Sequence, residues 1–306
     1  MSISFLLARL LRALLTLFGV VTLTFALSRL SGDPLGLLLP DTATLADREL
    51  LRASLGLDRS WLVQYVTYLR DLLSLDLGRS LAYERPALAV ILERVPATLE
   101  LGLGALVLSV LVSVPLGLVA AVKRNSLFDR AVMAFSLLVQ SVPSFVVGIL
   151  FILLFSVSLR LLPSFGRDSP ASLVLPVATL TLYPLAFLVR LTRAAVLDVI
   201  NQPFIRTARA KGVSPRTVVM KHALRNALIP VVTVVGLQLA SIISGSAIVE
   251  TVFAWPGIGW LAVQSIRTRD YPVIQGVVLL SSLAFSLITL VVDVLYTFID
   301  PRIQYS

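Results

Sequence analysis

The chain has 306 residues, with no cysteine and a single histidine. Without cysteine it forms neither a disulfide framework nor a thiolate metal site, and one histidine cannot form a histidine cluster. Charged residues make up only 14% of the chain and hydrophobic residues 57%, whereas soluble domains have about 25% charged residues. These shortages exclude an ordinary soluble domain and predict an all-α protein that crosses a membrane several times.

The formal net charge of +9 raises the question of nucleic-acid binding. The cations gather beside apolar segments, however, and they form neither a basic face with interleaved aromatic residues nor a zinc-finger spacing. The charge therefore points to the lipid bilayer as a partner and not to nucleic acid.

Six segments are apolar over the roughly 20 residues that a membrane-spanning helix needs. They lie at about 10–28, 98–122, 131–159, 173–191, 227–249 and 276–298. Pro115 and Pro143 are expected to bend the second and third spans. The first segment also resembles a signal peptide with a cleavage site at Ala26–Ser28. Its length exceeds the usual hydrophobic region of about 7 to 15 residues, which favours a retained span.

Short cytoplasmic loops carry an excess of Lys and Arg, and this rule orients the chain. Arg9 and Arg12 lie at the start of the first span, and the basic loop KRNSLFDR follows the second. Both termini are then cytoplasmic. Residues 31–95 have mixed charge and helical periodicity, which predicts an external helical subdomain. The expected organisation is 1–30 (cytoplasmic end and first span), 31–95 (external subdomain) and 96–306 (five-span core with a cytoplasmic loop at 194–226).

The densest cationic stretch lies between the fourth and fifth spans. Its basic residues are Arg206, Arg209, Lys211, Arg216, Lys221 and Arg225. Pro203 is a good first helical residue, Gly212 a plausible left-handed stop, and Ser214–Pro215 a second helix start. This punctuation predicts a helix, a tight turn and another helix. Such a loop is typical of a docking surface for a partner, and a basic surface that binds anionic lipid is the alternative.

The same loop resembles the EAA motif of ABC importer permeases. Arg206, Thr207 and Ala208 take the Glu-Ala-Ala places, and Gly212 takes the place of the glycine six residues after the Glu. Leu224 keeps a later leucine, but His222 and Arg225 replace the usual isoleucine and proline. RTARAKG followed by HALRNALIP is similar to the loop of the dipeptide and oligopeptide branch.

Further segments resemble the B-type subunit of that branch, in the same order along the chain. They are GVVTLTFALSRLSGDP, LGLDRSWLVQYVTYL, DLGRSL, ERVPATLELGL, ETVFAWPGIGWL, RDYPVIQG and the terminal DPRI. Trp260 departs from the pattern, because an arginine or a similar polar residue is common at its place.

The resemblance implies a permease subunit in the cell inner membrane that is not an enzyme and binds no cofactor. Its implied partners are a second, C-type permease, two cytoplasmic ABC ATPases that hold ATP and Mg²⁺, and an extracytoplasmic substrate-binding protein. The absence of the phosphate-binding pattern Gly-x-x-x-x-Gly-Lys-Ser/Thr agrees, because no lysine follows a glycine in the chain. The implied cargo is dipeptides or oligopeptides, with nickel, glutathione or oligosaccharides as alternatives.

The resemblance also makes the first part of the loop the coupling helix that the ATPases contact. Its residues are Phe204, Ile205, Arg206, Thr207, Ala208, Arg209, Ala210, Lys211 and Gly212. We expect Ile205, Ala208 and Gly212 to pack in an ATPase groove while Arg206, Arg209 and Lys211 set the orientation.

Polar residues near the spans are candidates for the translocation path. Gln140 and Gln238 are the favoured pair, whereas Glu100, Glu250 and Asp293 are expected to reach the membrane boundary or to pair with a nearby arginine. The external turn of Trp255, Pro256, Gly257, Gly259 and Trp260 is a candidate gate or binding-protein contact, with an interfacial aromatic belt as the alternative. No set of residues suggests a metal site.

Two rival classes explain less of the sequence. An ion-coupled secondary transporter predicts acids in the middle of the membrane and repeat-related broken helices, and neither is evident. An intramembrane enzyme needs a buried nucleophile and base together, but the one histidine lies in the cationic loop and there is no Gly-x-Ser-x-Gly motif.

Overall fold

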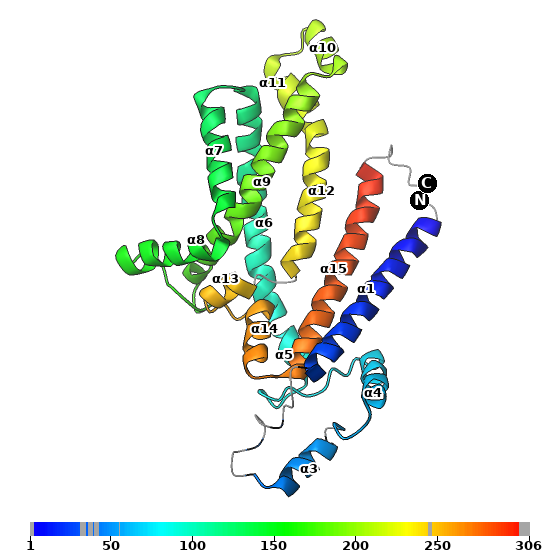
Figure 1. The fold of residues 1–306 in the computed structure, drawn as a ribbon. Coiled ribbons are helices and arrows are strands. Elements are labelled where there is room, and N and C mark those ends of the chain that lie inside the picture. The colour runs from blue at the N-terminus through cyan, green and yellow to red at the C-terminus, as the bar shows by residue number, and fades with distance from the viewer. Residues whose placement is uncertain are drawn as a thin grey trace.

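The computed structural model describes residues 3–30, 35, 39, 43–54, 56–243 and 247–299. Five helices in this part are long and apolar enough to cross a membrane. They are α1 (Ile3–Leu30), α6 (Val95–Val122), α9 (Val174–Ile200), α12 (Leu224–Ile243) and α15 (Tyr271–Ile299). All five run along the length of the molecule (Figure 1). The expected all-α, multi-span class is confirmed.

The expected third span is a broken pair of helices. α7 (Leu127–Ser141) is followed by α8 (Ser144–Phe151), which continues as the π-helix η1 (Ile152–Ser158). The two parts are bent by 99°, and α8 runs sideways from the bundle in Figure 1. Val142 has an extended backbone because a residue before proline is driven out of the helical region. The prediction of one bent span over 131–159 is therefore corrected to a sharp break at Val142–Pro143.

The centre of the bundle is formed by α6 and α9, which make the most extensive helix contact. Gly117 of α6 allows their close approach, because a Cβ atom there would lie 2.7 Å from both Thr192 Cβ and the Val189 carbonyl oxygen of α9. α7 and α12 pack beside this pair, and α1 lies along α15 (Figure 1).

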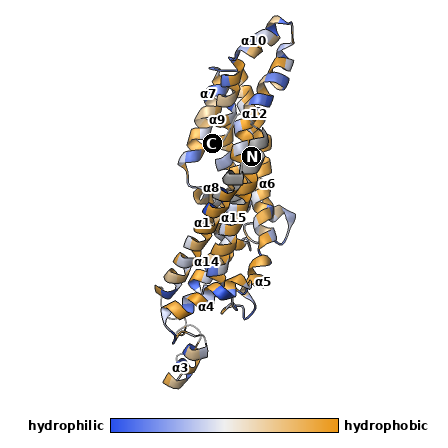
Figure 2. Ribbon diagram, turned by 90° about the vertical axis from the view of Figure 1, so that its right-hand side faces the viewer, coloured by the Kyte–Doolittle hydropathy of each residue, from blue (hydrophilic) through white to orange (hydrophobic). Residues whose placement is uncertain are grey.

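The two ends of the bundle are polar, whereas its middle is hydrophobic (Figure 2). The α10 end carries α10 (Pro203–Ala210), α11 (Pro215–Thr217) and the π-helix η3 (Val218–Ala223). The α4 end carries α3 (Leu45–Ser54), α4 (Trp61–Leu73), α5 (Ala87–Leu92) and α14 (Ile258–Arg267). The helices α3, α4 and α5 confirm that the segment after the first span is helical.

The observed helices also move two expected boundaries. α9 continues to Ile200, about nine residues past the expected end of the fourth span. α12 ends at Ile243 instead of near 249, and the short helix α13 (Ala247–Val252) follows it. The expected fifth span thus becomes a shorter helix and a separate one, which carries Glu250.

Candidate functional site

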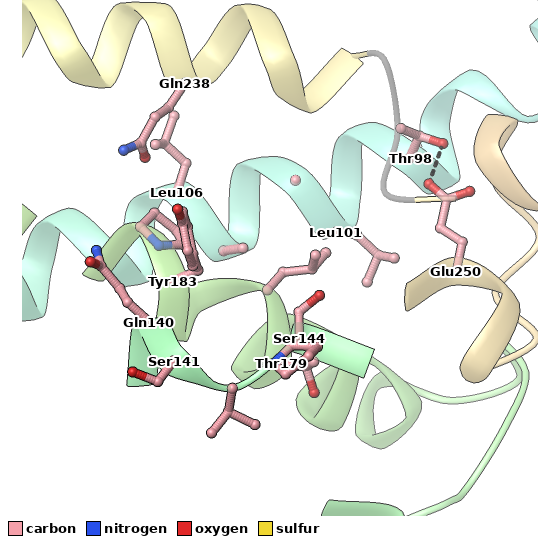
Figure 3. Close-up of a pocket in the computed structure, with 16 residues that line it drawn as sticks. Thr98, Leu101, Leu106, Gln140, Ser141, Ser144, Thr179, Tyr183, Gln238 and Glu250 are labelled. Carbon is pink, nitrogen blue, oxygen red and sulfur yellow. Dashed lines mark hydrogen bonds between the residues drawn. The ribbon is translucent and has the colours of Figure 1, made fainter. Parts of the chain in front are cut away.

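A cavity of about 680 Å³ lies within the bundle. Its wall is built from α6, the α7–α8 break, α9, α12 and α13 (Figure 3). The polar side chains on it include Thr98, Gln140, Ser141, Ser144, Thr179, Tyr183, Gln238 and Glu250. Both favoured path residues, Gln140 and Gln238, therefore face one cavity, although 98 positions separate them in the sequence.

Thr98 and Glu250 lie together at one end of the cavity, and Gln140 and Gln238 lie toward the other (Figure 3). The Glu250 side chain is buried, with 1% of its surface exposed. Its carboxyl group accepts hydrogen bonds from the Thr98 hydroxyl at 3.0 Å and from the Trp260 backbone amide at 2.9 Å. The prediction that Glu250 reaches the membrane boundary is wrong, because these donors hold the carboxyl group inside the protein.

The turn between α13 and α14 closes around this carboxyl group. The Thr98 hydroxyl accepts a hydrogen bond of 2.8 Å from the Ile258 amide, at the start of α14. A Cβ atom at Gly257 would lie 2.5 Å from both Glu250 Oε2 and Thr98 Oγ1. Thr98 and Glu250 thus join α6, α13 and α14 into one packed unit.

Trp255 belongs to the core of this unit. Its side chain is 1% exposed and its indole Nε1 donates a 2.8 Å hydrogen bond to the Ala97 carbonyl oxygen. The Trp255 side chain itself is therefore not exposed to a partner or to lipid, and the expected role of the turn as a gate or a contact stays a prediction. Trp260 is half-buried under the guanidinium of Arg94, 5.7 Å from its ring centroid. Nearby, Glu100 pairs with Arg167 at 2.9 Å, as expected for that carboxylate.

At the other end of the cavity, Gln140 of α7 is tied to α9. The Arg190 guanidinium donates a hydrogen bond to Gln140 Oε1. The amide nitrogen of Gln140 is buried and has no hydrogen-bond partner among the described residues. A buried donor without a partner costs about 1–3 kcal/mol, so the amide nitrogen of Gln140 lowers the stability of this fold.

A second link between α7 and α9 lies one turn further along α9. Arg193 donates two hydrogen bonds to the Asp129 carboxylate, 2.5 Å from Nε to Oδ1 and 2.7 Å from Nη2 to Oδ2. The Asn125 amide donates to the same carboxylate at 2.8 Å. This bidentate pair fixes the start of α7 against α9.

The α10 end has the helix, turn and helix that the punctuation predicted. Pro203 is the first residue of α10, Gly212 follows it with φ +77°, and the Ser214 side chain caps the next helix at the Thr217 amide. Exposed side chains on α10 include Phe204, Arg206, Thr207, Arg209 and Ala210, and Lys211 and Gly212 after it are exposed as well.

Ile205 is the exception, because its side chain is fully buried in its own chain. It packs against Val218 and Ala223 of η3, with Ala208 partly buried beside it. The prediction that Ile205 packs in a partner's groove is therefore wrong. Ile205 instead fastens α10 to the bundle, so that the Phe204 and arginine side chains face outward.

Sequence reasoning missed three residues of this site: Asp129, Arg190 and Arg193. Asp129 was counted only as part of the basic loop KRNSLFDR, and neither arginine was singled out. Arg190 and Arg193 are three residues apart near the end of an apolar segment, and this spacing on one helix face was a usable signal. Asp293 is part of α15, but its side chain lies outside the described residues, and its expected role is untested.

The fold and the cavity define a class: a multi-span helical membrane protein with a mostly apolar cavity that carries several polar side chains, and with a basic helix at one end. The chain belongs to the family described as binding-protein-dependent transport system inner membrane component, which it matches over residues 113–305. Residues 2–102 match the N-terminal region of the same kind of membrane component.

Two relatives are similar over essentially their whole length. The "Putative peptide transport system permease protein" of Brucella melitensis biotype 1 is 43% identical, with 100% of each chain covered. The glutathione transport system permease protein GsiC of Escherichia coli is 44% identical, covering 99% of this chain and all of the relative.

Among solved structures, an inward-facing form of the MetNI methionine ABC transporter has the same fold. Its TM-score is 0.59 at 23% sequence identity, over 69% of this chain and 96% of the other. The chain is thus the permease of an ABC importer, a multi-pass inner-membrane protein that acts with ATPase and binding-protein partners. ATP hydrolysis takes place on the partner subunits.

Proposed function

We propose that this chain is the B-type permease subunit of a peptide importer and that glutathione-like tripeptides belong to the same cargo class. The proposal rests on the 43% and 44% identity to a peptide and a glutathione permease over the full length. A second, C-type permease would complete the membrane pore. The external binding protein would deliver the peptide and select it first.

We place the α10 end in the cytoplasm, together with both termini, and residues 31–95 outside. The exposed cations of the α10 end, Arg206, Arg209 and Lys211, support this orientation, because short cytoplasmic loops are rich in Lys and Arg. The α4 end, with its mixed charges, then faces the binding protein.

Residues Phe204 to Gly212 are the proposed coupling helix. The exposed Phe204 and the arginines are available to an ATPase, while the buried Ile205 and the stop at Gly212 keep the helix short and rigid. A push on such a helix passes to η3 and α12 as a rigid-body movement.

The cavity is the proposed section of the translocation path, with Gln140 and Gln238 on its wall. The turn from Trp255 to Trp260 is the proposed external gate. Its support is that Gly257 packs directly on Glu250 and Thr98, which line one end of the cavity.

The test is ATP-dependent uptake of radiolabelled dipeptides and oligopeptides into proteoliposomes that contain the complete complex. We expect uptake by the intact complex, and none when residues 206–212 are replaced by a Gly-Ser linker in a complex that still assembles. Uptake that persists with the linker would refute the coupling assignment. If the intact complex takes up no peptide, the peptide assignment fails and nickel or oligosaccharide uptake is the next measurement.

A further inference from the structure

The Gln140 end of the cavity lies deep in the membrane. Gln140 is the second-last residue of α7, which starts at the α10 end, so it lies about 20 Å along that helix. The hydrocarbon core is about 30 Å thick, so Gln140 would lie inside it, about two-thirds of the way across from the α10 end. The helix breaks immediately after it, and Ser141, Val142, Pro143 and Ser144 all line the cavity. Non-helical backbone at this depth occurs where it lines a cavity or is buried in protein.

Arg190 determines which way the Gln140 amide faces. A guanidinium group has only donors, so the Gln140 oxygen must point at Arg190 and the NH₂ group must point away from it. That NH₂ group has no acceptor among the described residues. The pair therefore leaves an unpartnered hydrogen-bond donor buried beside the cavity, on a residue that lines it.

The charge of Arg190 is not balanced within the part of the chain that the structure describes. Its one hydrogen-bond partner there is the neutral Gln140, whereas Arg193, one turn along the same helix, is paired with Asp129. An ionisable side chain within a membrane segment marks a functional site by default. The region behind Gln140 is thus positively charged, and its positive charge strengthens the donor that Gln140 presents.

The opposite end of the cavity has the reverse character. The Glu250 carboxyl group has no donor of its own when ionised, and it accepts hydrogen bonds from the Thr98 hydroxyl and the Trp260 backbone amide. At the Gln140 end, a carboxylate of the cargo would lie near a hydrogen-bond donor and a positive charge. At the Glu250 end, it would lie near another carboxyl group. The two ends of the cavity therefore differ, with Gln140 toward one end and Glu250 at the other (Figure 3).

We propose that Gln140, positioned by Arg190, binds the free carboxylate of the cargo inside the membrane. This inference rests on the proposed function, because peptides and glutathione both carry a free carboxylate. Gln140 is the contact residue, and Arg190 is a positioning residue that orients its amide and supplies positive charge. The cargo would cross this section with its carboxylate toward the cytoplasmic side.

The test compares trialanine with trialanine amide, which differ only in the carboxylate. Initial rates of ATP-dependent uptake are measured in proteoliposomes with the complete complex and its binding protein. The same binding protein is used with every permease variant, so its own preference for one peptide contributes equally to each rate ratio. A change in the ratio between variants therefore reports the contribution of the permease. Gln140→Leu should lower the ratio of free to amidated peptide about tenfold, the effect of losing one hydrogen bond to a charged group. Gln140→Glu should lower it further, and Arg190→Met should lower it as well.

Two controls separate recognition from structure. Arg190→Lys keeps the charge and should keep most of the ratio. Gln238→Leu makes the same chemical change elsewhere on the cavity wall and should affect both peptides equally. If Arg190→Met does not assemble, Gln140→Glu decides the question. An unchanged ratio in Gln140→Leu and Gln140→Glu would overturn the carboxylate site and leave the peptide importer standing. Uptake of neither peptide by the intact complex would overturn the proposed function itself.

Discussion

Thr98 Oγ1 donates a 3.0 Å hydrogen bond to Glu250 Oε1 across 152 positions of sequence. The same hydroxyl oxygen accepts a hydrogen bond from the Ile258 amide. The Thr98 side chain is thus hydrogen-bonded both to the buried Glu250 carboxyl group and to the first amide of α14. Removal of the hydroxyl would leave the Glu250 carboxyl group and the Ile258 amide, both buried, without this hydrogen-bond partner.

Thr98→Val should lower the free energy of unfolding by about 2–4 kcal/mol, because each buried polar group that loses its partner costs about 1–3 kcal/mol. The measurement is the thermal unfolding midpoint in detergent, followed by tryptophan fluorescence, since Trp255 and Trp260 lie beside this site. Thr98→Ser retains the hydroxyl and should stay much closer to the wild type. Equal midpoints for Thr98→Val and the wild type would show that the hydroxyl carries no stability.

Gly257 and Gly212 should respond differently to alanine. At Gly257 the added Cβ would lie 2.5 Å from Glu250 and Thr98, so Gly257→Ala should cost about 3 kcal/mol or more. At Gly212 nothing lies within 4 Å, but φ is +77°, and Gly212→Ala should cost only about 1–2 kcal/mol of backbone strain.

The yield of monodisperse protein and its unfolding midpoint measure both effects. Gly212→Asn is the control, because asparagine tolerates the left-handed conformation and should recover part of the loss. If Gly212→Ala proved the more damaging substitution, the packing of Gly257 against Glu250 would have to be abandoned as an explanation.

Asp129→Asn should destabilise the protein by about 2 kcal/mol, because it leaves the Arg193 guanidinium without its charged partner. The control is Arg85→Ala, which removes an exposed ion pair with Glu93 whose side chains are 52% and 53% exposed. Solvent and salt screen that pair, so its loss should have little effect. Unfolding midpoints at low and high salt compare the two, and similar small shifts in both would argue against the α7–α9 link.

Ile205→Ala and Phe204→Ala test adjacent positions with opposite roles. Ile205→Ala opens a space under α10 and should raise the rate of trypsin cleavage after Arg206, Arg209 and Lys211 at least tenfold through local unfolding. Phe204→Ala should leave that rate unchanged and weaken copurification of the ATPases. If Phe204→Ala raised the cleavage rate and Ile205→Ala left it unchanged, the assignment of the buried and exposed faces of α10 would be reversed.

The α10 end could be predicted from sequence because its signals are local. Pro203, Gly212 and Ser214–Pro215 each act on the backbone within one turn, and the structure has the helix, turn and helix that they specify. The family resemblance was readable for a similar reason, since its segments occur in order along the chain.

The break at Val142–Pro143 could be predicted only in part. A proline fixes its own φ and restricts the residue before it, but the direction of the following helix depends on what it packs against. Contacts of α8 with α9 and α13 place that helix sideways, and no local pattern encodes them. The same holds for Glu250, whose burial depends on Thr98 in a distant helix, and for the pairing of Asp129 with Arg193.

α9 is one continuous helix that runs from the wall of the cavity to the α10 end of the bundle. Pro184 lies inside this helix and lines the cavity, and Ile200 lies about 24 Å further along it. A change of about 20° at Pro184, the size of a sharp kink, would move Ile200 and the attached α10 by about 8 Å. Arg190 lies on this arm between Pro184 and Ile200. The part of α9 beyond Pro184 would therefore act as a lever with its pivot on the wall of the cavity, so that a small change of angle there becomes a larger displacement of α10.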